Sequence, residues 1–189
     1  EQCNAVYITC EDPMDELRRR QEKINEALGI TMADLAGKLL LVSLKGHQGN
    51  ELALFDTQGR ITHFVSSMGT TGTIMGCSRF LKTQNPAIRI IGCQPEVGSQ
   101  IPGIRKWPDA YRPAIYEPSL VDEIVEVTQS DAEAMCRRLA CEEGIFAGIS
   151  AAGACCVALQ RAQCEQNATV VFVVCDRGDR YLSTGVFPV

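Results

Sequence analysis

The sequence predicts an α/β protein with a parallel, twisted sheet and helices on both faces. Two observations carry this prediction. From residue 61 onward, short apolar segments alternate with longer segments of helical periodicity. One apolar segment, residues 170–175, has no polar alternation, as expected for a strand that is covered on both sides. Strands and helices that alternate in this way build a parallel, doubly wound layer.

The N-terminal 58 residues predict a β-α-α-β segment. Asp12 and Pro13 supply a helix N-cap and a proline at the first helical position, and Gly29 ends that helix. In chain order, the strand, two helices and strand are predicted at residues 5–9, 13–28, 31–39 and 39–44. Residues 45–60 are predicted to be a connection that ends in a turn.

The remaining chain predicts four strands and three helices. The strands are expected at residues 61–66, 88–93, 121–127 and 170–175, the third of them at a sheet edge. The helices are expected at residues 73–84, 130–143 and 150–166. Ser130 is the expected N-cap of the second helix, with Glu133 in the capping-box position. Prolines and glycines predict an irregular stretch from 94 to about 120.

Composition narrows the class of protein. The formal net charge of −5 argues against a nucleic-acid or anionic-membrane surface. No apolar run approaches the roughly 20 residues that cross a bilayer, and no basic-then-apolar leader signals export. The chain begins with Glu1, which suggests a fragment. We expect a cytoplasmic protein without nucleic-acid or membrane partners.

Ten cysteines are present, but no C-x-x-C pair and only two histidines. A zinc site is therefore poorly supported, and we predict no metal site. Most cysteines lie among apolar residues, so we expect reduced thiols that pack as small hydrophobes.

The most informative loop follows the predicted strand at residues 61–66. It contains Gly69, Thr70, Thr71, Gly72 and Thr73, and a helix begins near its end. The glycines allow the backbone to approach an anion, the threonines add hydroxyl donors, and the helix N-terminus favours negative charge. The loop predicts a phosphate site; a tight structural turn is the alternative.

Residues 59–189 resemble the C-terminal half of O-acetylserine sulfhydrylases of the cysteine synthase B type. The resemblance rests on SSMGTTGTIMG (66–76), GCQPE (92–96), IPGIRKWP (101–108), EGIFAGIS (143–150) and CDRGDRYLSTG (175–185). It implies the large domain of the fold type II architecture, whose cofactor is pyridoxal 5'-phosphate. It also implies a homodimer that converts O-acetylserine and sulfide or thiosulfate to cysteine or S-sulfocysteine.

The resemblance assigns roles to residues of this sequence. Gly69, Thr70, Thr71, Gly72 and Thr73 would hold the cofactor phosphate. Ser150 would hydrogen-bond the pyridine nitrogen and leave the ring largely unprotonated, and Asp176 would lie near the same end of the ring. Arg105 and Trp107 match a mobile loop at the mouth of the active site.

One departure from the family limits the expected activity. The family binds its cofactor covalently through a lysine in an N-terminal S-x-K-D-R segment, which this sequence lacks along with the loop for the substrate carboxylate. Lys45 is the only lysine beside a predicted strand end, and a solvated turn lysine is its simpler interpretation. We therefore assign no catalytic residue and expect a cofactor-phosphate-binding protein without turnover.

Residues 1–58 resemble a different family, the RecA-like core of RepA-type plasmid helicases. The resemblance rests on AVYITCEDP (5–13), DELRRR (15–20), LLVSL (40–44) and FD (55–56). The G-x-x-x-x-G-K-[ST] element for nucleotide phosphates is missing. We expect a junction between a segment 1–58 and a truncated cofactor domain 59–189.

Two outcomes are open for the N-terminal segment. Its strands complete the open edge of the sheet, or that edge stays exposed and favours association. The alternatives to a cysteine synthase remnant are a non-catalytic chimeric α/β protein and a RecA-like ATPase fragment.

Overall fold

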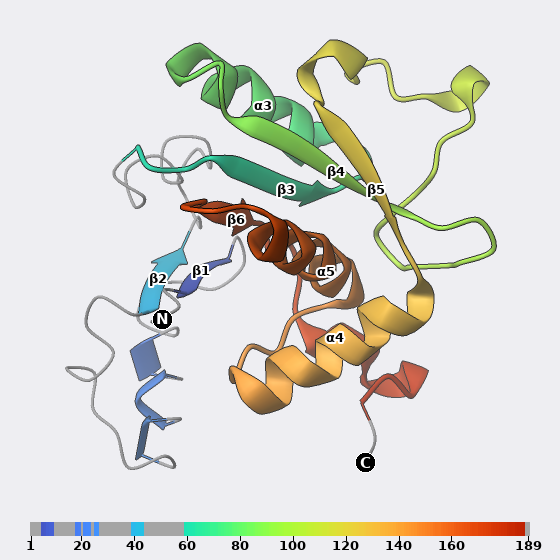
Figure 1. Cartoon of the computed structure of the whole chain (residues 1–189). Helices are drawn as coiled ribbons and strands as arrows, with labels where there is room; N and C mark the ends of the chain where they lie inside the picture. The colour runs from blue at the N-terminus through green and yellow to red at the C-terminus, as the bar shows by residue number, and fades with distance from the viewer. Residues whose placement is uncertain are drawn as a thin grey trace.

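The computed structural model describes residues 5–9, 18–19, 21–23, 25–26, 39–43 and 59–187. Its central feature is a parallel sheet of four strands in the order β5-β4-β3-β6 (Figure 1). The strands are β3 (His63–Ser67), β4 (Arg89–Pro95), β5 (Glu123–Val127) and β6 (Val170–Phe172). The predicted fold class is confirmed, and β5 is an edge strand as predicted.

Helices cover both faces of this sheet. Helix α3 (Gly72–Gln84) lies on one face, and helices α4 (Gln129–Glu142) and α5 (Ile149–Cys164) lie on the other (Figure 1). The long stretch between β4 and β5 is irregular as predicted, apart from two short 3-10 turns at Asp109–Tyr111 and Pro118–Leu120. A third, Gly178–Thr184, follows β6.

Alternating side chains of the strands build two apolar cores. Phe64 of β3 and Ile90 of β4 belong to the core under α3, whereas their neighbours Val65 and Ile91 belong to the core under α4 and α5. All four side chains are fully buried, as the period of two in a strand requires. Gly153 lets α5 pack closely against the side chain of Ile104, because a Cβ at position 153 would lie 3.3 Å from Ile104 Cδ1.

The N-terminal strands do not join this sheet. Strands β1 (Ala5–Thr9) and β2 (Leu39–Ser43) pair in parallel with each other in a separate sheet of two strands. The suggestion that they complete the open edge of the larger sheet is therefore wrong. Residues 18–19, 21–23 and 25–26 are helical, inside the predicted helix at 13–28. The predicted helix at 31–39 and the connection up to residue 58 lie outside the described residues, except for Leu39, which is in β2.

Two predicted boundaries are corrected. Helix α4 is capped by Thr128, whose Oγ1 accepts a hydrogen bond of 3.0 Å from the Asp131 amide, and not by Ser130. Glu133 accepts from the Gln129 side chain at 2.7 Å and forms no capping box. Strand β6 ends at Phe172 rather than at residue 175, because its pairing with β3 stops there. Farther along the chain, Arg177 forms an isolated antiparallel bridge with Ala147.

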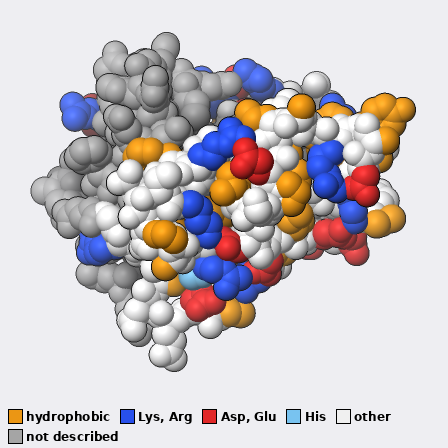
Figure 2. Space-filling model, turned by 90° about the horizontal axis from the view of Figure 1, so that it is seen from above, with side chains coloured by type: hydrophobic (Ala, Val, Ile, Leu, Met, Phe, Trp, Pro, Cys, Tyr) orange, Lys and Arg blue, Asp and Glu red, His pale blue; other side chains and the backbone are white. Residues whose placement is uncertain are grey.

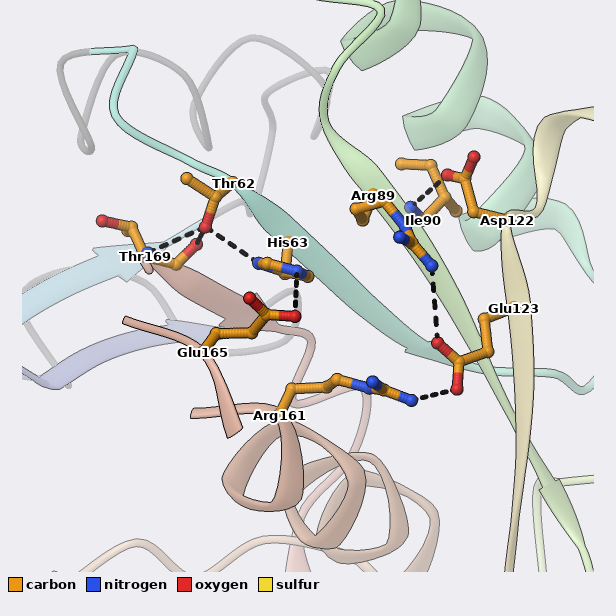
Figure 3. Close-up of polar contacts among 9 residues, drawn as sticks. All are labelled: Thr62, His63, Arg89, Ile90, Asp122, Glu123, Arg161, Glu165 and Thr169. Atoms are coloured by element: carbon orange, nitrogen blue, oxygen red, sulfur yellow. Dashed lines mark hydrogen bonds and ion pairs between the residues drawn. The ribbon is translucent and has the colours of Figure 1, made fainter. Parts of the chain in front are cut away.

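The amino ends of the strands are joined by polar side chains (Figure 3). Glu123 forms ion pairs with Arg89, from the start of β4, and with Arg161, from the end of α5. His63 lies 2.9 Å from the Thr62 hydroxyl and 3.9 Å from Glu165, and burial lowers the pKa of its imidazole. These contacts fasten the end of the sheet that is opposite to the loop at residues 69–73.

Six of the cysteines in the described residues are free thiols: Cys93, Cys136, Cys141, Cys155, Cys156 and Cys164. Cys93, Cys136, Cys155 and Cys156 are buried, which confirms their predicted place in the core. Burial raises the pKa of the first three to about 12 and that of Cys156 to about 11. The thiols of Cys141, Cys164 and Cys175 lie in exposed residues.

The surface shows positive and negative side chains interspersed over the described part of one face (Figure 2). Several of them form ion pairs, for example Lys82 with Asp122 and Arg138 with Glu142. None of the helices in the described part of the chain combines the length and the apolarity that a membrane crossing needs.

Candidate functional site

The loop at residues 69–73 lies where β3 ends and α3 begins, at the carboxyl edge of the sheet (Figure 1). Ligands of open α/β sheets bind at this edge. The first turn of α3 contains no acidic residue, and no side chain caps the helix. Apart from bonds inside helices and strands, no backbone amide of residues 69–73 donates a hydrogen bond to a backbone carbonyl in the described part of the chain. These amides and the positive end of the helix macrodipole suit an anion.

Thr71 is the most unusual residue of this loop. It is the N-cap of α3 with φ +66°, a left-handed conformation that is costly for a β-branched residue. Its side chain is buried, and within the described residues its Oγ1 has no hydrogen-bond partner. A buried hydroxyl without a partner costs free energy unless a ligand satisfies it. Thr71 therefore marks a place for a hydrogen-bonding ligand.

A second segment, residues 101–107, is fastened to the loop. The Arg105 amide donates to the Met68 carbonyl at 2.9 Å, and Trp107 Nε1 donates to the Gly69 carbonyl at 2.6 Å. The Arg105 guanidinium lies 5.9 Å from the centre of the Trp107 ring, within the range of a cation–π contact. Both residues that the sequence placed at the mouth thus lie beside the predicted phosphate loop.

Gly103 lies between this loop and Ser150. A Cβ on Gly69 would lie 2.6 Å from the Gly103 carbonyl oxygen, and a Cβ on Gly103 would lie 3.1 Å from Ser150 Oγ. Gly103 has φ +86°, so both its conformation and its surroundings favour glycine. The predicted phosphate loop and Ser150 are therefore brought to the same edge of the sheet.

Ser150 belongs to the first turn of α5 and is buried. The Ser67 hydroxyl donates to its main-chain carbonyl at 2.6 Å, which joins the end of β3 to α5. Ser150 Oγ lies 3.5 Å from Asp176 Oδ1 and 3.5 Å from Cys175 Sγ. The N-cap of α5 is Gly148, and no acidic residue lies in its first turn.

Asp176 is joined to residues on both sides. Its main-chain carbonyl accepts from the Gly148 amide at 3.0 Å, and its Oδ2 accepts a hydrogen bond from the Tyr181 hydroxyl. The structure thus brings Ser150 and Asp176 together, as the sequence suggested for the ring end of the site.

Three residues of this region were assigned no role by the sequence: Ser67, Gly103 and Tyr181. Gly103 had a usable signal, because a Pro-Gly pair predicts a turn with positive φ. Ser67 and Tyr181 had none, because their partners lie on other elements.

Comparisons with known proteins show which sequences and folds this chain is similar to. Residues 2–176 match the family model described as "Pyridoxal-phosphate dependent enzyme". This match includes nearly all of residues 1–58, for which the helicase resemblance stays a prediction. Cysteine synthase B of Pseudomonas aeruginosa is 60% identical over 131 residues, which are 69% of this chain and 44% of that protein. Cysteine synthase B of Escherichia coli is also 60% identical over 131 residues, 43% of its length.

Solved structures show the same fold. Cysteine synthase from Entamoeba histolytica has a TM-score of 0.67 and 27% identity, covering 89% of this chain and 54% of that one. O-ureido-L-serine synthase has a TM-score of 0.64 and 25% identity, and the match covers 99% of this chain and 77% of that one. The fold is thus that of fold type II enzymes, and the chain spans less than half the length of the curated relatives named above. The chain belongs to the family of pyridoxal-phosphate dependent enzymes.

Proposed function

We propose that this chain forms the cofactor-binding part of a cysteine synthase that uses O-acetylserine and sulfide or thiosulfate. The observation that carries the proposal is the unpartnered, buried hydroxyl of Thr71 at the N-terminus of α3, on the same sheet edge as Ser150. The 60% identity to proteins named cysteine synthase B supports the substrate class.

The residues present fit pyridoxal phosphate. Amides of residues 69–73 and the Thr71 hydroxyl would bind the phosphate, which supplies the missing partner of that hydroxyl. Ser150 would face the ring nitrogen, with Asp176 behind it. When bound, pyridoxal phosphate supplies an electron sink for elimination and addition at the substrate β-carbon.

Arg105 and Trp107 would form the mouth of the site. Trp107 is fixed to the Gly69 carbonyl, and Arg105 is an exposed cation beside it. A cation at this position favours substrates that carry a carboxylate or an oxyanion. O-acetylserine carries a carboxylate, and thiosulfate is an oxyanion.

We assign no catalytic residue to this chain. Lys82 is held by Asp122, and Lys106 is held by Glu126, so neither is offered as the residue that bonds to the cofactor. Lys45 lies outside the described residues. The chain by itself is expected to bind the cofactor without turnover. The free thiols in the described part support the cytoplasmic location, and the homodimer remains an expectation from the resemblance.

The test is ligand-dependent thermal unfolding. The ligand is 4-deoxypyridoxine 5'-phosphate, which has the ring and the phosphate but no aldehyde that could react with surface lysines. A ligand that binds only the folded state raises the melting temperature as its concentration rises above Kd. We expect a clear rise with this ligand, a small rise with inorganic phosphate and none with unphosphorylated pyridoxine.

Two variants sharpen this test. Thr71→Ala should abolish most of the rise, whereas Thr83→Ala, near the other end of α3, should leave it unchanged. A rise with ATP alone would instead favour the RecA-like ATPase alternative. No rise with any ligand would favour a non-catalytic chimeric protein. Cysteine formation by the purified chain would overturn the proposed lack of turnover.

A further inference from the structure

Thr62 and Thr169 directly precede β3 and β6 and tie the amino ends of these two strands together (Figure 3). The Thr169 carbonyl accepts hydrogen bonds from the amides of Thr62, at 3.0 Å, and His63, at 3.2 Å. The Thr169 amide donates in turn to Thr62 Oγ1 at 2.9 Å. Strand β6 contains only three residues, so its attachment to β3 depends strongly on these bonds at its start.

The hydroxyl proton of Thr62 has two acceptors within reach. The Thr169 carbonyl oxygen lies 3.1 Å from Thr62 Oγ1, and His63 Nδ1 lies 2.9 Å from it. That carbonyl already accepts two amide protons, one for each of its lone pairs. By contrast, a neutral imidazole with its proton on Nε2 has a free lone pair at Nδ1. The count of lone pairs therefore favours His63 as the acceptor of this proton.

His63 is buried, with only 8% of its surface exposed, and charged groups of both signs act on its ring. Glu165, after the end of α5, and Glu123, of β5, favour the imidazolium. Arg89, of β4, and Arg161, of α5, oppose it. Burial has the largest influence, and it lowers the pKa of His63 below the ordinary value of 6.5. The ring is therefore neutral at pH 7 and can accept a hydrogen bond at Nδ1.

A second proton on His63 changes this arrangement, because an imidazolium donates at both nitrogens and has no lone pair left. The Thr62 hydroxyl must then accept from Nδ1 and turn its own proton to the Thr169 carbonyl, to which two amides already donate. Nε2 gains a charged partner in Glu165 at 3.9 Å, but the Glu165 side chain is 44% exposed, so solvent screens this gain. Charging the ring therefore removes a well-formed hydrogen bond and returns little.

We propose that Thr62, His63 and Thr169 form a pH-sensitive clamp between β3 and β6. At neutral pH the Thr62 hydroxyl donates to Nδ1 of the uncharged His63 ring, and the clamp is closed. Protonation of His63 reverses this bond and loosens the amino end of the sheet, so that β6 separates from β3 more easily as the pH falls. The clamp lies at the end of the sheet opposite to the loop at residues 69–73 and does not depend on the proposed function.

The first experiment locates the proton on His63 by NMR of protein labelled with ¹⁵N in its histidine rings. The chain has two histidines, and His47→Gln identifies the signals of His63. We expect the proton on Nε2 at about pH 7.5 and a pKa below 6.5. Thr62→Val should raise this pKa, because it removes a donor that only the neutral ring can use, and Thr62→Ser, which keeps the hydroxyl, should not. A wild-type ring with its proton on Nδ1, or a pKa that stays or falls in Thr62→Val, would overturn the proposal.

The second experiment measures stability against pH by urea unfolding of the wild type and of His63→Asn. The asparagine oxygen can replace Nδ1 as an acceptor but takes up no proton. Because the folded pKa of His63 lies below the unfolded one, its contribution is complete above 6.5 and is lost as the pH falls towards the folded value. The unfolding equilibrium constant of the wild type should rise by up to about tenfold for each pH unit between the two values, and His63→Asn should lack this rise. An equal pH dependence in both proteins would contradict the clamp.

The third experiment needs only the wild type and locates the loosening. Amide hydrogen exchange is measured at about pH 7.5 and about pH 5 and corrected for the intrinsic effect of pH on exchange. Protection of the amides of β6 should fall at the lower pH, whereas that of β5, at the other edge of the sheet, should not. Protection that falls equally in both strands, or in neither, would show that His63 does not control the pairing of β6 with β3.

Discussion

The hydroxyl of Ser67 donates a hydrogen bond of 2.6 Å to the main-chain carbonyl of Ser150. This bond joins the last residue of β3, which directly precedes the phosphate loop, to the first turn of α5. The two sides of the candidate site lie on these two elements. The bond therefore sets how far the phosphate loop lies from the hydroxyl assigned to the ring nitrogen.

Replacing Ser67 by alanine should separate these two sides. We expect the free energy of unfolding to fall by about 1 kcal/mol, the usual contribution of one hydrogen bond. The affinity for 4-deoxypyridoxine 5'-phosphate should fall more than the affinity for inorganic phosphate, because only the former contacts both sides. Isothermal titration calorimetry measures both affinities. Ser130→Ala, on the exposed side of α4, is the matched control, and an equal loss for both ligands would contradict the prediction.

Much of the sheet could be predicted from the sequence, because β3 and β4 contain short apolar segments that are followed by turn residues. The loop at residues 69–73 was also predictable, since its glycines and threonines are local signals. The pairing of the N-terminal strands was not predictable. Nothing in the sequences of β1 and β2 shows whether they pair with each other or with the edge of the larger sheet. The contact from Tyr181 to Asp176 could not be predicted either. It depends on the 3-10 turn at Gly178–Thr184, for which the sequence carries no clear signal.

Replacing Thr71 by glycine should stabilise the ligand-free chain while weakening phosphate binding. Glycine removes the strain at φ +66° and the buried hydroxyl without a partner. We expect the free energy of unfolding to rise by about 1 kcal/mol after the loss of the side-chain methyl is included. Urea unfolding with and without phosphate measures both effects. A fall in ligand-free stability, or full stabilisation by phosphate, would show that Thr71 serves only the turn.

Asp122 predicts a specific dependence of stability on pH. Burial alone would raise the pKa of this carboxyl, but hydrogen bonds from Lys82 and from the Ile90 amide, each 2.7 Å long, lower it below its usual 3.8. The ionised form therefore stabilises the fold. Its contribution is complete above the unfolded pKa and is lost as the pH falls through the lower, folded value.

Asp122→Asn should therefore cost about 2 kcal/mol near pH 6, and this cost should disappear as the pH falls well below 4. Urea unfolding across this range measures the difference. Asp109→Asn is the control, because the Asp109 side chain is 90% exposed. A difference between Asp122→Asn and wild type that stays constant down to the lowest pH would contradict the assignment of the effect to ionised Asp122.

Gly148→Ala tests the space around Asp176. A Cβ at position 148 would lie 2.5 Å from Asp176 Cγ, so the carboxylate must move and its contacts with Ser150 and Tyr181 must break. We expect the free energy of unfolding to fall by about 2 kcal/mol. The double variant with Asp176→Ala removes the atoms that clash, so its loss should be clearly smaller than the sum of the two single losses. Additive losses in this double-mutant cycle would place the cost of Gly148→Ala in the backbone of α5 rather than at the carboxylate.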